Sequence, residues 1–473
     1  MPLNIAVLRE TQDGERRVAV DPTVASRLAK LGFSVAIEKG AGDLAGFPDD
    51  TYSDVEFVDS ASQAIAGAQI IAKVLPPDAD QAAQMKDGDV LVSYMYPHAN
   101  HDLVKTLANG GVSSLSMELI PRITRAQAMD ALSSQATVSG YQSALMAAQL
   151  APRLFPMLTT AAGTIRPARV VVIGAGVAGL QAIATARRLG AQVEAYDIRP
   201  AAKEQVESLG AKLIDTGVNA EGEGGYAREL TDDEKQQQAD ALARHIAKAH
   251  AVISTAAIPG RPAPKIITQA MVEAMPPGGV IIDLAAETGG NCEVTVPGET
   301  VEHGDKRIHG PLNVPSLAPV HASEMYAKNI LNLLTSMIED EEFVINLEDE
   351  VVAGCLLTHK GSVTHAPTRE AMGIAAPAPI AQKGSDEAEQ TPTSASTQHF
   401  LEAPQGEADD LKKISGVGPK LEGVLNNAGI YHYWQIARLD AEALAILDEK
   451  LKFKGRIQRD GWIDQAKTLM GGE

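Results

Sequence analysis

The feature that most constrains this chain is a glycine-rich turn between a predicted strand and a predicted helix. Gly174, Gly176 and Gly179 form the pattern Gly-Ala-Gly-Val-Ala-Gly directly after the apolar run 170–173. The first glycine permits a tight turn, the second lets the backbone approach a pyrophosphate, and the third lets the helix pack on the strand. The amino terminus of such a helix attracts phosphate groups. The pattern therefore predicts a dinucleotide site in a parallel α/β sheet.

An acidic residue follows this turn at the spacing typical of a dinucleotide site. Asp197 lies 23 residues after Gly174, at the end of the next predicted strand, near the usual offset of about 20 residues. A carboxylate accepts hydrogen bonds from a ribose 2′-hydroxyl and repels a 2′-phosphate, which favours NAD(H) over NADP(H). Arg199 means that NADP(H) is still a possible ligand, because an arginine here can accommodate a 2′-phosphate. Its alternatives are a solvent-facing charge or a contact with the adenine.

The rest of the first 370 residues predicts more structure of the same kind. Short apolar runs alternate with helical stretches from residue 1 to about 135, and a second alternation begins at Arg169. Alternating strands and helices indicate parallel sheets with helices on their faces. We therefore expect an α/β fold with two doubly wound parallel-sheet (Rossmann-like) domains. The small apolar residues of 137–162 predict a long connecting helix buried between these domains.

The pattern also predicts domain boundaries. We expect a discontinuous first domain of residues 1–136 with 320–369, and a nucleotide-binding second domain of residues 137–319. Residues 370–408 lose all periodicity and are dominated by Ala, Pro, Ser, Thr, Gln and Glu, which predicts a disordered linker. Residues 409–473 regain an apolar pattern and predict a small all-α module.

Composition and charge exclude several classes of function. The net charge of −20 repels polyphosphate, so nucleic-acid binding by the whole chain is not expected. Cys292 and Cys355 are the only cysteines, which indicates a reducing cytoplasm and allows no zinc cluster. The start of the chain predicts a strand and not a signal peptide, and we find no apolar run long enough to cross a membrane. No metal site is expected, because paired ligand spacing is missing from His303, His309, His321, His359 and His365.

An ordered set of motifs resembles the alpha subunit of proton-translocating nicotinamide nucleotide transhydrogenase. The motifs lie within about residues 1–370 and read RETQDGERRVAVDP, MELIPRITRAQAMDALSSQATVSGY, VIGAGVAGLQAIATARRLGAQVEAYDIRP, GGYA and GGVIIDLAAETGGNCE. The resemblance implies the fold of alanine dehydrogenase, a homodimer, and NAD(H) bound by the second domain. It also implies that a beta subunit presents NADP(H), that a membrane-spanning subunit carries the proton channel, and that hydride passes directly between the two nicotinamides. The chain would then be cytoplasmic and attached to the membrane through these partners.

The same resemblance assigns residues to the nucleotide site. A positioning loop matches Arg122, Gln127, Asp130 and Ser133, and the three-residue spacing of the last three predicts one face if the loop is helical; the alternative is an ordinary polar helix face. A mobile loop that closes over the nucleotide matches Gly225 and Tyr226. Direct hydride transfer needs positioning and no acid, base or nucleophile. The other residues expected to contact the nucleotide are Gly174, Ala175, Gly176, Val177, Gly179, Asp197, Ile198, Arg199, Thr255 and Ala256.

Alanine dehydrogenase is the main alternative enzyme. Arg16 and Lys73 stand where that enzyme carries its carboxylate-binding residues, and Glu287 stands near its catalytic carboxylate. Tyr96 replaces its catalytic histidine, however, and His98 would point elsewhere in an extended segment. We therefore expect the arginine and the lysine to serve as structural ion-pair or packing residues. A non-catalytic NAD(H) sensor is the third possibility, because binding and catalysis use the same residues.

The C-terminal segment resembles a helix-hairpin-helix motif in ISGVGPKLEGVLNNAGI, residues 414–430. In DNA-binding examples the turn amides contact phosphate, and Lys412, Lys413 and Lys420 would assist. Residues 409–473 nevertheless carry ten basic and ten acidic residues and are neutral. A protein-docking module is favoured over a passive extension, and nucleic-acid binding is the least expected role.

Overall fold

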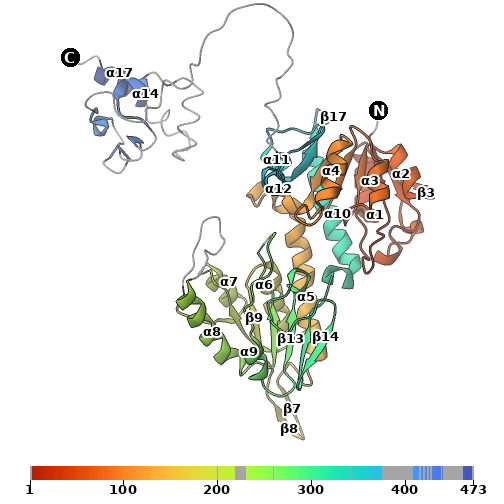
Figure 1. Ribbon diagram of the computed structural model, residues 1–473, viewed down its shortest axis with the longest axis vertical. Coiled ribbons are helices and arrows are strands. Elements are labelled where there is room, and N and C mark those ends of the chain that lie inside the picture. Colours follow the sequence, from red (N-terminus) through yellow and green to blue (C-terminus); the bar gives the residue numbers. More distant parts are fainter. Residues whose placement is uncertain are drawn as a thin grey trace, which may run out of the picture. The chain divides into compact units, whose positions relative to one another are not determined.

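The computed structural model describes residues 3–199, 201–218, 231–258, 260–340 and 342–374, with parts of 408–470. The chain divides into two compact units, Met1–Pro379 and Ile380–Glu473. The first unit contains two large sheets with helices packed on them (Figure 1). Gly225, Tyr226 and most of the predicted linker lie outside the described residues.

The first sheet has eight strands in the order β19-β18-β6-β5-β4-β1-β2-β3. The six strands from the start of the chain are parallel to their neighbours, and β18 joins β6 in the antiparallel sense. The chain therefore returns to this sheet after it has built the second one. The strands are β1 (Asn4–Val7), β2 (Ser34–Glu38), β3 (Glu56–Val58), β4 (Ile70–Ala72), β5 (Val90–Ser93), β6 (Ser113–Ser116), β18 (Leu356–His359) and β19 (Ser362–Val363).

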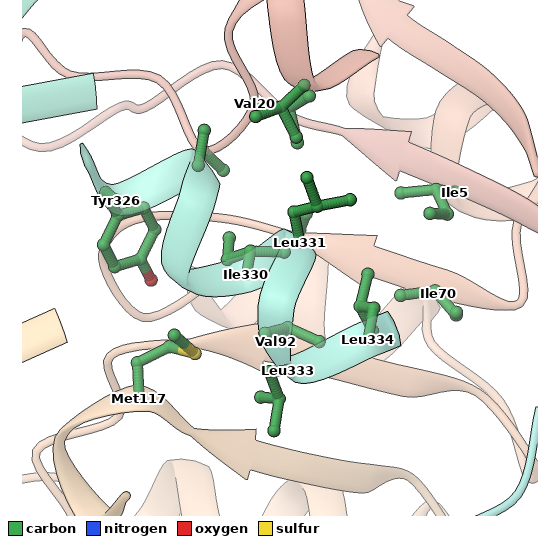
Figure 2. Packing of buried hydrophobic residues seen from close by; sticks show 14 of the residues in the cluster. Ile5, Val20, Ile70, Val92, Met117, Tyr326, Ile330, Leu331, Leu333 and Leu334 are labelled. Carbon is green, nitrogen blue, oxygen red and sulfur yellow. The ribbon is translucent and has the colours of Figure 1, made fainter. Parts of the chain in front are cut away.

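Helix α10 (Pro319–Ser336) is packed into the apolar interior on one side of this sheet. Its buried Tyr326, Ile330 and Leu334 face side chains of the strands, among them Ile70 and Val92 (Figure 2). We call this sheet with its helices the first domain. Its other helices are α1 (Pro22–Lys30), α2 (Ala61–Gly67), α3 (Ala79–Gln84), α4 (His101–Asn109), α11 (Glu350–Cys355) and α12 (Ala366–Ala371).

Short 3-10 helices and small strands complete the connections of the first unit. As the sequence predicts, Asp21 caps α1 by accepting a hydrogen bond from the Val24 N–H, with Pro22 at the first helical position. The 3-10 helices are η1 (Asp43–Ala45), η2 (Asp49–Thr51), η3 (Met117–Leu119), η4 (Thr124–Met129), η6 (Ala286–Thr288) and η7 (Val314–Leu317), and β16 (Ile338–Glu339) pairs with β17 (Glu342–Phe343).

Helix α5 (Ala131–Leu150) leads from the first sheet to the second (Figure 1). The predicted helix over 137–162 is therefore wrong at both ends. The helix ends at Leu150, because the helical conformation is disfavoured for Ala151, the residue before Pro152. The segment beyond it forms an exposed two-stranded ribbon of β7 (Leu158–Thr160) and β8 (Gly163–Ile165).

The second sheet has seven strands in the order β11-β10-β9-β12-β13-β15-β14, parallel except for β14. The strand order reverses between β10 and β12 around β9, and in such sheets ligands bind at the carboxyl ends of the strands beside the reversal. We call this sheet with its helices the second domain. Its elements are β9 (Arg169–Ile173), β10 (Gln192–Tyr196), β11 (Lys212–Leu213), β12 (Ala251–Ser254), β13 (Val280–Asp283), β14 (Thr300–His303), β15 (Lys306–His309), α6 (Val177–Arg188), α7 (Ala202–Ser208), α8 (Asp232–Ile246) and α9 (Gln269–Glu273).

The described part of the second unit is helical, with η8 (Leu411–Lys413), α14 (Tyr433–Ala437) and α17 (Trp462–Met470). Leu411, Leu425 and Trp462 lie in its apolar core. The predicted α/β fold class with a small helical module is thus confirmed. Among the helices that the structure describes, none is long and apolar enough to cross a membrane.

Candidate nucleotide site

The glycine-rich turn lies at the reversal of strand order in the second domain. Gly174 follows β9 with a φ of +89°, and a Cβ there would lie 2.7 Å from Thr255 Oγ1. A Cβ on Gly179 would lie 1.8 Å from the Gly174 carbonyl oxygen, so only glycine lets α6 approach the strand this closely. Gly176 caps α6, and a Cβ there would meet no atom within 4 Å. The backbone around Gly176 is therefore open to a phosphate group.

Asp197 follows β10 and holds the turn from the side. Its carboxylate accepts hydrogen bonds from the Ala175 N–H at 2.7 Å and from the Arg199 N–H at 2.8 Å. The Arg199 guanidinium donates two more, both at 2.9 Å. Burial opposes ionisation, but these hydrogen bonds outweigh it and lower the pKa of Asp197 below its ordinary value. The carboxylate is therefore ionised at neutral pH and within reach of the turn.

The other predicted residues of this site lie around the same strand ends. Val177 is the exposed first residue of α6, whereas Ile198 packs partly on the core. Thr255 follows β12, and its hydroxyl donates to the carbonyl oxygens of Ile173 and Gly174. Ala256 comes next and lies near Gly174. These residues thus lie with the glycine turn at the carboxyl ends of β9, β10 and β12.

The sequence interpretation missed Asn291, which fixes the loop that carries Ala256. The Asn291 side chain is fully buried. Its amide donates to the carbonyl oxygens of Ala256 and Pro264 at 2.8 and 2.9 Å, and its oxygen accepts from the Ser254 hydroxyl at 2.6 Å. The quoted motif GGVIIDLAAETGGNCE contains this asparagine, but its residue type alone does not indicate such contacts.

The predicted positioning loop is formed by η4 and the first turn of α5. Asp130 caps α5, and its carboxylate accepts from the Ser133 N–H at 2.9 Å and from the Ser133 hydroxyl at 2.6 Å. Gln127 belongs to η4 instead, so these three residues do not share one helical face. Arg122 and Gln127 are both exposed. Asp130 and Ser133 are therefore bonded to each other, and Gln127 projects separately from the preceding turn.

Helix α5 connects this loop to the glycine-rich turn. Gly140 packs against α6 so closely that a Cβ there would lie 2.1 Å from the Ala178 carbonyl oxygen. Asp130 stands ten residues earlier on α5, about 15 Å along the axis at 1.5 Å per residue. The predicted positioning loop and the amino-terminal end of α6 are thus held at a fixed separation.

The residues that would serve an alanine dehydrogenase are arranged differently. Lys73 is 1% exposed, and its ammonium pairs with the buried Glu10 carboxylate at 3.2 Å. Tyr96 adopts a φ of 45° and stacks on Tyr94 with ring centroids 5.5 Å apart. His98 is exposed and lies edge-on to the Tyr96 ring. The lysine is thus a buried ion-pair residue, as the sequence analysis expects.

Arg16 differs from that expectation, because its neighbour Arg17 makes the buried ion pair. The Arg16 side chain is exposed and takes part in no ion pair among the described residues. The Arg17 guanidinium pairs with the Glu15 carboxylate at 2.6 Å and donates to Gln135 in α5 and to Asn313, which precedes η7. The sequence did not reveal this buried charge cluster. It links α5 and the segment before η7, the two places where the chain passes between the domains.

Glu287 and most of the candidate histidines make hydrogen bonds within the first unit. The Glu287 carboxylate accepts a hydrogen bond from the Asn313 N–H at 2.7 Å. No cluster of three or more potential metal ligands occurs within the described ranges. Of the five histidines considered as metal ligands, His321 is exposed. The other four bond to a nearby hydroxyl or carboxylate: His303 to Glu273, His309 to Thr300, His359 to Ser113 and His365 to Thr368.

Comparison with known protein families matches nearly the whole length of the chain. The model "Alanine dehydrogenase/PNT, N-terminal domain" matches residues 6–139, and "Alanine dehydrogenase/PNT, C-terminal domain" matches residues 143–366. The model "RS2/RL21/YNQ2 HHH domain" matches residues 411–470, in agreement with the helix-hairpin-helix resemblance.

The sequence identities to individual relatives distinguish the two enzymes of this family. The first of the chains that make up NAD(P) transhydrogenase subunit alpha in Rhodospirillum rubrum is 45% identical over 377 residues, which cover 77% of this chain and 98% of the relative. The crystal structure of transhydrogenase from Sinorhizobium meliloti is 44% identical with a TM-score of 0.70, and the match covers 76% of this chain and 99% of that one. Alanine dehydrogenase of Mycolicibacterium smegmatis is 26% identical over 369 residues, 76% of this chain and 94% of the relative. The chain therefore belongs to the alanine dehydrogenase/PNT family, in which its sequence stands with the transhydrogenase alpha subunits.

Proposed function

We propose that this chain binds NAD(H) at the glycine-rich turn and positions it for direct hydride transfer to NADP(H) on a beta subunit. When bound, the nicotinamide supplies the hydride chemistry, so the chain has to bind, orient and exclude water. Gly176 and the start of α6 suit a pyrophosphate, and the ionised Asp197 suits a ribose diol. Gln127 suits the carboxamide. The alternative dehydrogenase needs cations for its substrate carboxylate and an acid or base for the reaction. Arg16 is exposed and would remain available as one such cation, so the choice between the two enzymes depends on Lys73 and Tyr96.

The observation that carries the choice between the two enzymes is the burial of Lys73. Its ammonium is paired with Glu10 and almost inaccessible to solvent, so it is not available to a substrate carboxylate. Tyr96 occupies the place of the catalytic histidine, and burial raises its pKa well above its ordinary value. A phenol held protonated in this way is a poor base. Both features favour hydride transfer without acid or base assistance.

We further propose that the chain works in an assembly. The relatives are named as alpha subunits, some of them as one portion of a divided alpha subunit, which supports partner chains. In our proposal the chain is a homodimer that binds a beta subunit carrying NADP(H), and a membrane-spanning subunit couples hydride transfer to proton translocation. The chain would then be attached to the cytoplasmic face of the inner or plasma membrane through these partners.

For the C-terminal module we propose protein docking. The ammonium of Lys412 is paired with Asp410 at 2.8 Å and with Glu422 at 2.7 Å, so its charge is neutralised within the module. Lys420 lies outside the described residues. We expect the full chain to pass through a DNA column at about 50 mM salt. Retention that falls steeply with salt would contradict the docking role.

The experiment that tests the enzymatic proposal mixes this chain with a purified NADP(H)-binding beta subunit. We expect hydride transfer from NADH to an NADP⁺ analogue only when both proteins are present. Gln127→Asn should slow transfer and leave NADH affinity largely intact, whereas Gln149→Asn at the exposed end of α5 should change neither. Consumption of NADH with pyruvate and ammonium would establish the dehydrogenase instead. Tight NADH binding without activity in either assay would indicate a sensor.

A further inference from the structure

We propose that Asn329 and Asn332 of α10 are positioning residues that fix the turn carrying Gln127. This inference rests on the proposed hydride transfer and assigns a role to a helix that the nucleotide itself does not need to touch. The two asparagines lie about 200 residues after Gln127 in the sequence. Their connection is a single carbonyl oxygen, that of Ala128.

Both asparagine amides donate to this oxygen. The Nδ2 of Asn329 and the Nδ2 of Asn332 each lie 2.9 Å from the Ala128 carbonyl oxygen. Ala128 is near the end of η4, where the last carbonyls of a helix lack partners within it. A carbonyl oxygen has two lone pairs and can accept both hydrogen bonds. The two amides therefore replace the partners that the end of η4 lacks.

The Asn329 side chain is itself held in place by a second hydrogen bond, to its amide oxygen. Asn329 is only 6% exposed, and its Oδ1 accepts a hydrogen bond from the Ser134 hydroxyl at 2.7 Å. Its amide is thus oriented by α5 and directed at η4. Asn332 lies three residues further on α10, on the same face of the helix, and is partly exposed.

The helix that presents the two asparagines is rigidly packed. Figure 2 shows Ile330 and Leu333 of α10 in the apolar core, and both side chains are fully buried. The Tyr326 hydroxyl donates to the Lys73 carbonyl oxygen at 3.0 Å. A helix with this much buried side-chain surface is a fixed support for the amides.

The other side of η4 has a separate attachment. Arg125 donates two hydrogen bonds, at 2.7 and 2.8 Å, to the Asp349 carboxylate, which caps α11. Gln127 therefore lies between the Arg125 ion pair and the Ala128 carbonyl that the two asparagines hold. Its own side chain is exposed and makes no hydrogen bond to the described residues. The asparagines hold the main chain, and the glutamine amide stays available to a ligand.

The test uses the full chain with the beta subunit. Asn329→Asp keeps the shape of the side chain but replaces its donor by an acceptor, and Asn332→Ala removes the second donor at a less buried place. We expect each to slow hydride transfer about tenfold, with the Kd for NADH within about twofold. The matched control is Ser336→Ala on the same helix, because among the described residues the Ser336 hydroxyl bonds only to the Leu333 carbonyl oxygen of its own helix.

A double-mutant comparison separates positioning from general support of the fold. If the asparagines act through Gln127, adding Asn332→Ala to Gln127→Asn should slow transfer by less than about twofold. Multiplying losses would overturn the positioning role, as would a Kd that rises in step with the loss of rate, or variants that match the Ser336→Ala control. If the wild-type mixture transfers no hydride, the proposed function fails and this role fails with it.

Discussion

Replacing Gly140 by alanine should separate α5 and α6, the two helices that carry the halves of the proposed nucleotide site. A Cβ at this position would lie 2.1 Å from the Ala178 carbonyl oxygen and 2.9 Å from Gln181 Cβ. Ordinary contact begins at 3.4 Å, so the backbones of α5 and α6 have to move apart by about 1.3 Å. Neither partner is the flexible end of a long side chain, and the displacement cannot be absorbed by a rotamer change.

Two opposing terms set the effect of this substitution on stability. Alanine improves the helix propensity of α5 by about 1 kcal/mol, and overpacking between the helices costs about 1–3 kcal/mol. We therefore expect the free energy of unfolding to fall by about 0–2 kcal/mol. The effect on function should be larger, because a misplacement of about 1 Å can slow an oriented reaction about a hundredfold. Asp130 and Gln127 would move with α5 relative to Gly176.

Stopped-flow measurement of hydride transfer, beside NADH binding and urea denaturation, tests this expectation. The matched control is Gly67→Ala at the end of α2, where a Cβ would meet nothing within 4 Å. We expect that variant to equal the wild type in hydride transfer and in NADH binding, and to gain up to about 1 kcal/mol in the free energy of unfolding from the helix propensity of alanine. If Gly140→Ala transfers hydride as fast as Gly67→Ala, the separation between the loop and the turn does not control the reaction.

Three further predictions concern single side chains. Asp197→Ala should raise the Kd for NADH about tenfold or more in a fluorescence titration, and unchanged affinity would remove the ribose assignment. Lys73→Met should lower the free energy of unfolding in urea by about 3–5 kcal/mol, because it leaves the buried Glu10 unpaired, and adding Glu10→Gln should recover some of the loss. Hydrogen bonds from Arg125 lower the pKa of Asp349 from 3.8 to about 2. The stabilisation by this pair is therefore complete above about pH 4 and lost as the pH falls towards 2. In Asp349→Asn the melting temperature should change less with pH over that range than in the wild type.

The geometry of the glycine-rich turn could be predicted because its signal is local. Gly174 needs a positive φ and Gly179 needs close contact with the turn, and both requirements leave glycines at fixed spacing in the sequence. The end of α5 was also encoded locally, by Pro152, but the small apolar residues around it led to a longer predicted helix. Local patterns were therefore sufficient for the fold class and less so for the boundaries.

The contacts that support the site could not be predicted in this way. Asn329 and Ala128 are 201 residues apart in the sequence, and Arg17 and Asn313 are 296 apart. Asparagine and arginine occur on many surfaces, and only the fold brings these particular residues together. Arg16 illustrates the problem, because the adjacent arginine of the same motif turned out to be the buried one.

The antiparallel pairing of β18 with β6 also determines when the first domain can be completed during synthesis. About 240 residues separate Ser116 from Leu356, so at about 5–20 residues per second β6 is made roughly 10–50 s before its neighbour. An open strand edge can pair with strands of other nascent chains during that interval. Three of the four residues of β6 are serines, and the hydroxyls of Ser113 and Ser114 later bond to side chains of β18. The strand that stays unpaired on one side until β18 is made is thus rich in serine, which limits pairing between neighbouring nascent chains.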